Sequence, residues 1–172
     1  MKKLSLIVSI LFCFFISKQV KAQNCGSCDI SIFGNDTLSY TVFAGQSVCI
    51  DSAANFTGIL ILNGGTICNK GLFTPMNFTF NSGTINNYSN ITITQSIIIN
   101  ANCNVIINDG GAFSITSGDL HINGGNFTNN GLTSISGNIQ NASGTITNSS
   151  LVNCSHLLGN PLTSNSGIVN SN

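Results

Sequence analysis

Cysteines are the residues of this 172-residue chain whose type and spacing bear most directly on chemistry. Cys25 and Cys28 form a C-x-x-C pair, which is half of a zinc site or a redox pair. A zinc site needs a second cysteine pair at the usual spacing, and a thioredoxin-like site needs a βαβ context. The chain offers neither, so we expect no metal and no cofactor.

Asp119 and His121 are the other pair that could act together in catalysis, because residues at i and i+2 share one face of a strand. A polysaccharide lyase or hydrolase would need clustered carboxylates and usually a cation to hold the sugar. Asp109 lies ten residues before Asp119, the chain has no Arg, and Lys70 lies far away in sequence. We therefore interpret the pair as part of a solvated strand face and predict no catalytic residue.

The N-terminus has the three-part layout of a secretory signal peptide. Lys2 and Lys3 precede an apolar run over residues 4–16, and Ala22 and Val20 occupy the cleavage positions. The run is shorter than the roughly 20 residues that span a membrane. We expect residues 1–22 to be removed, leaving an exported chain without a membrane span.

Removal of this segment changes the charge. Four of the five lysines leave with it, so Lys70 faces five aspartates and the side chains sum to −4. One cation cannot build a basic patch, which argues against nucleic-acid binding.

The sequence contains a repeat, which we expect to position the cysteines and the charged residues. Segments beginning at Gly65, Gly83, Gly125 and Gly144 follow the pattern G-[TN]-[IF]-x-N-x-[GS], with starts 18, 42 and 19 residues apart. The 42-residue interval reads as two units of 21, with a degenerate copy over residues 104–110. A sixth, imperfect copy covers residues 166–170.

Two columns recur in these units. The first is apolar and predicted to face inward: Ile67, Ile85, Ile106, Phe127 and Ile146. The second comes two residues later: Asn69, Asn87, Asn108, Asn129 and Asn148. Asn tolerates a left-handed corner, and stacked Asn side chains can hydrogen-bond between layers.

Units of about 20 residues with short strands and no helical period predict an all-β protein, a parallel β-helix. A leucine-rich repeat would need an L-x-x-L-x-L frame, and a β-sandwich would not keep the Asn column in step. We assign residues 23–63 to an N-terminal β cap with the first coil or coils, and residues 64–172 to the repeat region. The last copy either caps itself or, as we favour, belongs to a longer protein.

The coil length also predicts disulfides. Cys49 and Cys68 are 19 residues apart, about one coil, so they should face each other on neighbouring layers and pair. Cys25 and Cys28 are then expected to pair with each other. Cys103 and Cys154 are 51 residues apart, about two and a half coils, and are expected to stay unpaired.

An ice-binding face would need Thr-x-Thr on successive coils. The positions that flank the predicted inward column fulfil this pattern only at Thr145 and Thr147. This makes an ice-binding solenoid the least favoured function.

Residues 64–71 and 80–88 resemble the Asn/Gly-rich coils of right-handed parallel β-helix (pectin-lyase-like) regions in exported, adhesin-like surface proteins of Gram-negative bacteria. The resemblance covers roughly residues 45–172 and implies a right-handed coil and an extracellular or cell-surface location. It implies a structural or adhesive module without catalysis, with surface glycans or other surface proteins as partners. The alternative is a carbohydrate-binding or carbohydrate-cleaving β-helix.

Overall fold

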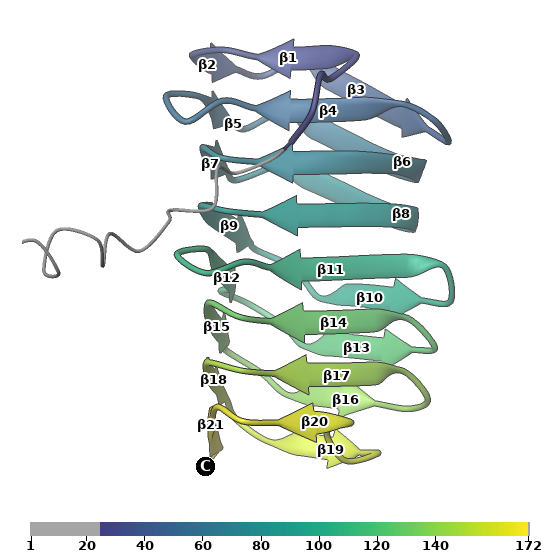
Figure 1. The fold of residues 1–172 in the computed structure, drawn as a ribbon, viewed down its shortest axis with the longest axis vertical. Helices are drawn as coiled ribbons and strands as arrows, with labels where there is room; N and C mark the ends of the chain where they lie inside the picture. The colour runs from purple at the N-terminus through teal and green to yellow at the C-terminus, as the bar shows by residue number, and fades with distance from the viewer. Residues whose placement is uncertain (1–24, 172) are drawn as a thin grey trace, which may run out of the picture.

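The computed structural model describes residues 25–171, so the predicted signal peptide lies outside the described residues. The described chain is an all-β, parallel solenoid of about seven turns that stack into a rod (Figure 1). This confirms the predicted fold class. Residues 25–171 contain no helix long and apolar enough to cross a membrane.

Two parallel sheets, A and B, run along the rod, and a third, sheet C, covers its C-terminal coils (Figure 1). Sheet A contains β1 (Ile30–Ile32), β3 (Ser39–Phe43), β4 (Ser47–Ile50), β6 (Ile59–Asn69), β8 (Asn77–Asn87), β11 (Cys103–Ile107), β14 (Asn126–Asn129), β17 (Thr145–Asn148) and β20 (Ser164–Asn165). Sheet B contains β2 (Asn35–Asp36), β5 (Asn55–Phe56), β7 (Leu72–Phe73), β9 (Asn90–Ile93), β12 (Ala112–Ile115), β15 (Leu132–Ile135), β18 (Leu151–Cys154) and β21 (Ile168–Ser171). Sheet C contains β10 (Ile97–Asn100), β13 (Leu120–Asn123), β16 (Ile139–Asn141) and β19 (Leu157–Gly159).

The core fills the inside of the coil, because side chains alternate between the two faces of each short strand. Residues of one type stack on their equivalents in the next coil. The rings of Phe56 and Phe73, which are register partners in sheet B, stack at 5.7 Å between centroids. Four members of the predicted inward column are fully buried: Ile67, Ile85, Phe127 and Ile146.

The predicted register is wrong in the third unit. Val105, not Ile106, is the partner of Ile85 and Phe127, and Ile106 faces outward. With a period of two, the coil buries either the set of Cys103, Val105 and Ile107 or the neighbouring set that contains two asparagines. The first set is all apolar, so its burial is favoured.

Asn108 consequently leaves the Asn column, and Ile107 takes its place between Asn87 and Asn129. The corner after Ile107 is longer than in the neighbouring coils, and the Gly111 N–H closes it on the Asn108 carbonyl at 2.9 Å. The two neighbouring coils therefore measure 20 and 22 residues from Ile85 to Val105 and from Val105 to Phe127. Aligning the repeat units without gaps places Asn108 in the Asn column and so hides this one-residue shift.

The other predicted Asn residues form a buried ladder that links the coils. Asn69 donates from Nδ2 to Oδ1 of Asn87 at 2.8 Å, and Asn129 donates likewise to Asn148 at 2.9 Å. The ladder is interrupted at Ile107, which has no side-chain polar atom. The predicted hydrogen bonding between layers is thus confirmed in two separate stretches.

The predicted left-handed conformation of these asparagines is wrong. Among the described non-glycine residues, only Asn102 has a positive φ. Asn69, Asn87 and Asn148 instead accept a backbone hydrogen bond at Oδ1 from the residue two positions further on, as Asn69 does from Gly71 at 3.2 Å. Asn is needed here because one amide satisfies both the corner and the next coil.

The coil registers continue across the predicted end of the cap. That boundary, between Asn63 and Gly64, lies inside β6. Ile32 of β1 pairs with Ile50 of β4, and Ile50 with Asn69 of β6, in the same column as the later asparagines. The first described coil therefore stacks in register with those that follow.

Candidate functional site

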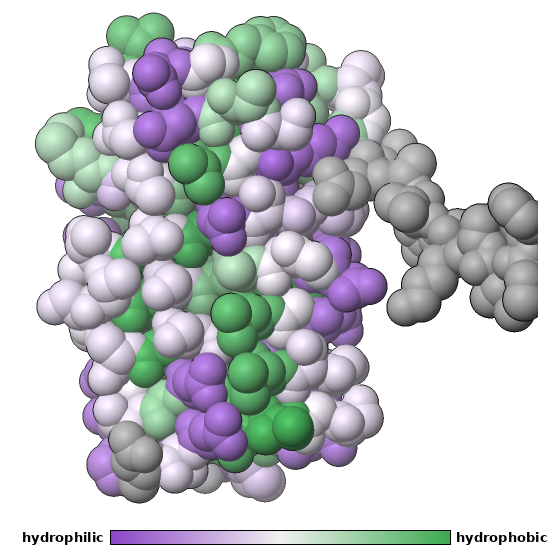
Figure 2. Space-filling model, turned by 90° about the vertical axis from the view of Figure 1, so that its left-hand side faces the viewer, coloured by the Kyte–Doolittle hydropathy of each residue, from purple (hydrophilic) through white to green (hydrophobic). Residues whose placement is uncertain are grey.

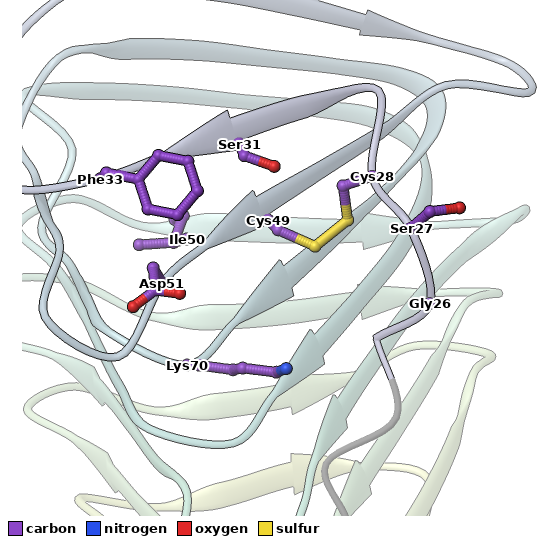
Figure 3. Close-up of a pocket in the computed structure, with 9 residues that line it drawn as sticks. All are labelled: Gly26, Ser27, Cys28, Ser31, Phe33, Cys49, Ile50, Asp51 and Lys70. Atoms are coloured by element: carbon purple, nitrogen blue, oxygen red, sulfur yellow. A yellow bond between two sulfur atoms is a disulfide. The ribbon is translucent and has the colours of Figure 1, made fainter.

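The four N-terminal cysteines form two disulfides, but the predicted pairing is wrong. Cys25 pairs with Cys68 and Cys28 with Cys49, at Cα separations of 5.8 and 5.7 Å. Cys49 and Cys68 are indeed register neighbours on adjacent coils. The segment before β1 runs across the outer face of sheet A, where Cys28 reaches Cys49 of β4 (Figure 3). Cys25 reaches Cys68 of β6, one coil further on.

Cys103 and Cys154 are the free cysteines among the described residues, and both are buried. The Cys103 thiol lies 3.6 Å from the carbonyl oxygen of Asn81. Burial raises the pKa of both thiols. They belong to the core, where a neutral thiol packs as a small apolar group.

A pocket of about 360 Å³ lies beside the disulfides on this face of the first coils (Figure 3). Its lining combines the disulfide-bonded segment with side chains from β1, from β4 and from the corners that follow β1, β4 and β6. The lining residues are Gly26, Ser27, Cys28, Ser31, Phe33, Cys49, Ile50, Asp51 and Lys70. The two disulfides tie this wall to the coils beneath it.

Asp51 and Lys70 both line the pocket but do not form an ion pair. Asp51 follows Ile50, and the Lys70 N–H donates to the Ile50 carbonyl at 2.9 Å, so the two residues sit at neighbouring coil positions. Nevertheless, the only ion pair within 4.0 Å among the described residues joins His121 to Asp119. Figure 3 shows the Lys70 ammonium and the Asp51 carboxylate turned apart.

The repeat pattern does not predict this pocket. Lys70 carried a signal, because it is the one lysine outside the predicted signal peptide. No sequence pattern predicts the path of the N-terminal segment across two coils, because this path depends on which disulfides Cys25 and Cys28 form.

Asp119 and His121 lie on the outer side of sheet C, as the i, i+2 spacing predicts, with Nε2 of His121 4.0 Å from Oδ2 of Asp119. The carboxylate is occupied by its neighbours in the next coil. It accepts hydrogen bonds from the Asn138 N–H at 2.7 Å and from Nε2 of Gln140 at 2.8 Å. These bonds link two coils, and they account for Asp119 as a structural residue.

No group of three or more His, Cys, Asp or Glu side chains within residues 25–171 is arranged to hold a metal ion. The five aspartates are distributed along the chain rather than gathered in one groove, and Asp29 is held by hydrogen bonds with the Ser47 side chain and backbone. The Ser47 contacts lower the pKa of Asp29.

The outer face of sheet A does not carry a regular Thr ladder. With the corrected register, the third coil presents Asn104 and Ile106, and the next presents Asn126 and Thr128. Thr145 and Thr147 remain the one Thr-x-Thr pair among the aligned coils.

The outer face of sheet B carries an apolar line instead. Ala112, Leu132, Leu151 and Ile168 are successive register partners. Leu132 and Ile168 are 42% and 64% exposed. Figure 2 shows hydrophobic side chains gathered over the C-terminal coils of this face, beside polar ones.

The chain matches no protein-family model, no curated protein and no solved structure.

Proposed function

We propose that this protein is a non-catalytic, exported module that acts as a rigid rod at the cell surface and binds surface glycans or other surface proteins. The carrying observation is the stack of in-register coils, which turns single residues into continuous columns on the outer faces. Such columns suit extended partners better than a single small substrate.

The arrangement of ionisable groups supports a role without catalysis. Acid–base chemistry on a glycosidic bond needs two carboxylates roughly 5–10 Å apart across the bond. Asp119, the one carboxylate that lies beside a histidine, is engaged by Asn138 and Gln140. The apolar line on sheet B adds a surface suited to a protein partner.

Two disulfides support export, because disulfides persist in oxidising compartments. The expected mature N-terminus is Gln23. When a secreting host expresses the protein, mass spectrometry of the protein recovered from the medium should find Gln23 at its N-terminus. Recovery of the uncleaved chain inside the cells would contradict export.

Binding and turnover should be measured on the same purified mature protein. We expect retention on a glycan array or on intact bacterial cells, and no release of reducing ends from any arrayed polysaccharide. Clear turnover would favour the alternative, a carbohydrate-active β-helix. Thermal hysteresis at micromolar protein would favour the ice-binding function.

A further inference from the structure

The pocket beside the disulfides has the properties of a preformed small-molecule site. Its volume, about 360 Å³, falls within the roughly 300–1,000 Å³ typical of ligand pockets. The Cys28–Cys49 disulfide forms part of its lining, and Cys25–Cys68 anchors the same segment one coil further on. A cross-linked wall lowers the entropic cost of ordering the site around a ligand.

The pocket presents one charge of each sign with unused bonding capacity. Oδ1 of Asp51 accepts hydrogen bonds from Ser52 and Ala53, whereas Oδ2 has no donor among the described residues. The Lys70 ammonium has no hydrogen-bond or ion-pair partner there either. Because the two groups do not neutralise each other, the pocket is complementary to a ligand that carries both charges.

An exposed aromatic ring completes the site. Phe33 is 72% exposed at the rim, although it is among the largest apolar side chains of the first coil. A ring held against solvent beside two charges can cover an apolar or aromatic ligand group. Without residues 1–22 the side chains sum to −4, one lysine against five aspartates, and this charge disfavours simple anions, whereas a zwitterion carries no net charge into the field.

We propose that this pocket binds a zwitterionic α-amino acid with an apolar or aromatic side chain. The ligand ammonium lies at Asp51, the carboxylate at Lys70, and the side chain against Phe33. This site is independent of the adhesive role, because it needs only the first coils and their disulfides.

Three ligands of one skeleton test the proposal by NMR titration of the oxidised mature protein: phenylalanine, phenethylamine and 3-phenylpropanoate. Phenethylamine lacks the carboxylate, and 3-phenylpropanoate lacks the ammonium. Phenylalanine should bind about fivefold more tightly than either, as expected when one partly exposed ion pair is lost. Equal affinities for all three, or no saturable shift with phenylalanine, would overturn the proposal.

Variants locate the site. Lys70→Gln and Asp51→Asn should each weaken phenylalanine binding about fivefold, and each should abolish the preference over one of the two single-charge ligands. Phe33→Ala should weaken all three ligands alike. Phe43→Ala and Asp109→Asn remove the same groups away from the pocket, and should leave binding unchanged. Tighter binding of a neutral saccharide such as maltose would contradict the charge-based selectivity.

Loss of phenylalanine binding in the pocket variants, with retention on cells or glycans intact, would place the two activities at separate sites. Failure of the amino acid to bind at all would sink this inference and leave the adhesive function standing. Unchanged thermal unfolding of Lys70→Gln and Asp51→Asn confirms that these variants are folded.

Discussion

At the residue scale, the buried asparagines are the residues on which the stack depends most specifically. Asn129 donates to Oδ1 of Asn148 and to the Leu151 carbonyl, and its own Oδ1 accepts from the Thr133 hydroxyl. Asn129, Thr133 and Asn148 are fully buried, so water cannot replace the bonds among them. The ladder explains why Asn recurs inside an otherwise apolar core.

Replacing Asn129 by Ala should lower the free energy of unfolding by about 2–4 kcal/mol, because buried partners lose their hydrogen bonds. The matched control is Asn130→Ala, since Asn130 is half-buried and its side chain makes no hydrogen bond within the described chain. Chemical denaturation of both variants measures the difference. Equal costs would contradict a role for the ladder.

The buried thiols predict a pH effect. Because burial raises the pKa of Cys103 and Cys154, the unfolded chain loses these protons at lower pH than the folded chain. Their stabilising contribution is present below the unfolded pKa, about 8.5, and is lost as pH rises through the folded value. The free energy of unfolding should therefore fall between about pH 8 and 10.

A Cys103→Ala/Cys154→Ala variant should show a flatter fall over the same range, whatever its absolute stability. Denaturant titrations at each pH measure both slopes. Parallel slopes for the two proteins would show that other groups, such as Tyr40, cause the alkaline loss. The Asp36 carboxylate that accepts the Tyr40 hydroxyl raises the pKa of that tyrosine.

At the element scale, the corners of successive coils are in close contact. A Cβ built on Gly131 would lie 2.2 Å from the Gly111 carbonyl oxygen and 2.7 Å from that of Asn108. Both are backbone atoms, so the coils themselves would have to separate. Ser150 occupies the equivalent corner one coil later and carries its Cβ there.

Gly131→Ala should therefore destabilise the protein by about 1–3 kcal/mol, as overpacking does. Ser150→Ala, in the equivalent corner, should stay within about 0.5 kcal/mol of the native protein. Thermal unfolding of the two variants compares them. A neutral Gly131→Ala would show that the corners are less tightly packed than described.

Peptic cleavage in acid, where disulfide exchange is slow, distinguishes the observed pairing from the pairing predicted from coil length. Cuts after Phe33, Phe43, Phe56, Leu62 and Leu72 separate three cysteine-containing peptides. The pairing of Cys25 with Cys68 and Cys28 with Cys49 joins all three into one species. A free N-terminal peptide, with the other two joined, would restore the pairing predicted from coil length.

Much of this architecture can be predicted from the sequence, because a repeat repeats its environment. The strands and the inward column follow from the alternation around Ile67, Ile85, Phe127 and Ile146. The third coil and the disulfides escape prediction for a common reason. Each depends on a local departure from the repeat, namely the longer corner after Ile107 and the segment that crosses two coils.

At the scale of the whole molecule, the pocket and the apolar line on sheet B are products of stacking. Lys70 and Asp51 come together because their coils are adjacent, and Leu132 and Ile168 align because the coils stay in register. In the sequence these residues lie far apart, and nothing marks them as neighbours. The stacking of the coils brings such residues together on shared surfaces.

The register of the third coil therefore tests the account most directly. Two double variants, Asn86→Cys/Ile106→Cys and Asn86→Cys/Ile107→Cys, represent the observed register and the register predicted from the repeat. Asn86 and Ile106 are Cα partners that both face outward, whereas Ile107 faces the core. Intact-mass measurement after mild oxidation should find a new disulfide in the Ile106 pair alone. A cross-link formed only by the Ile107 pair would contradict the observed register of the third coil.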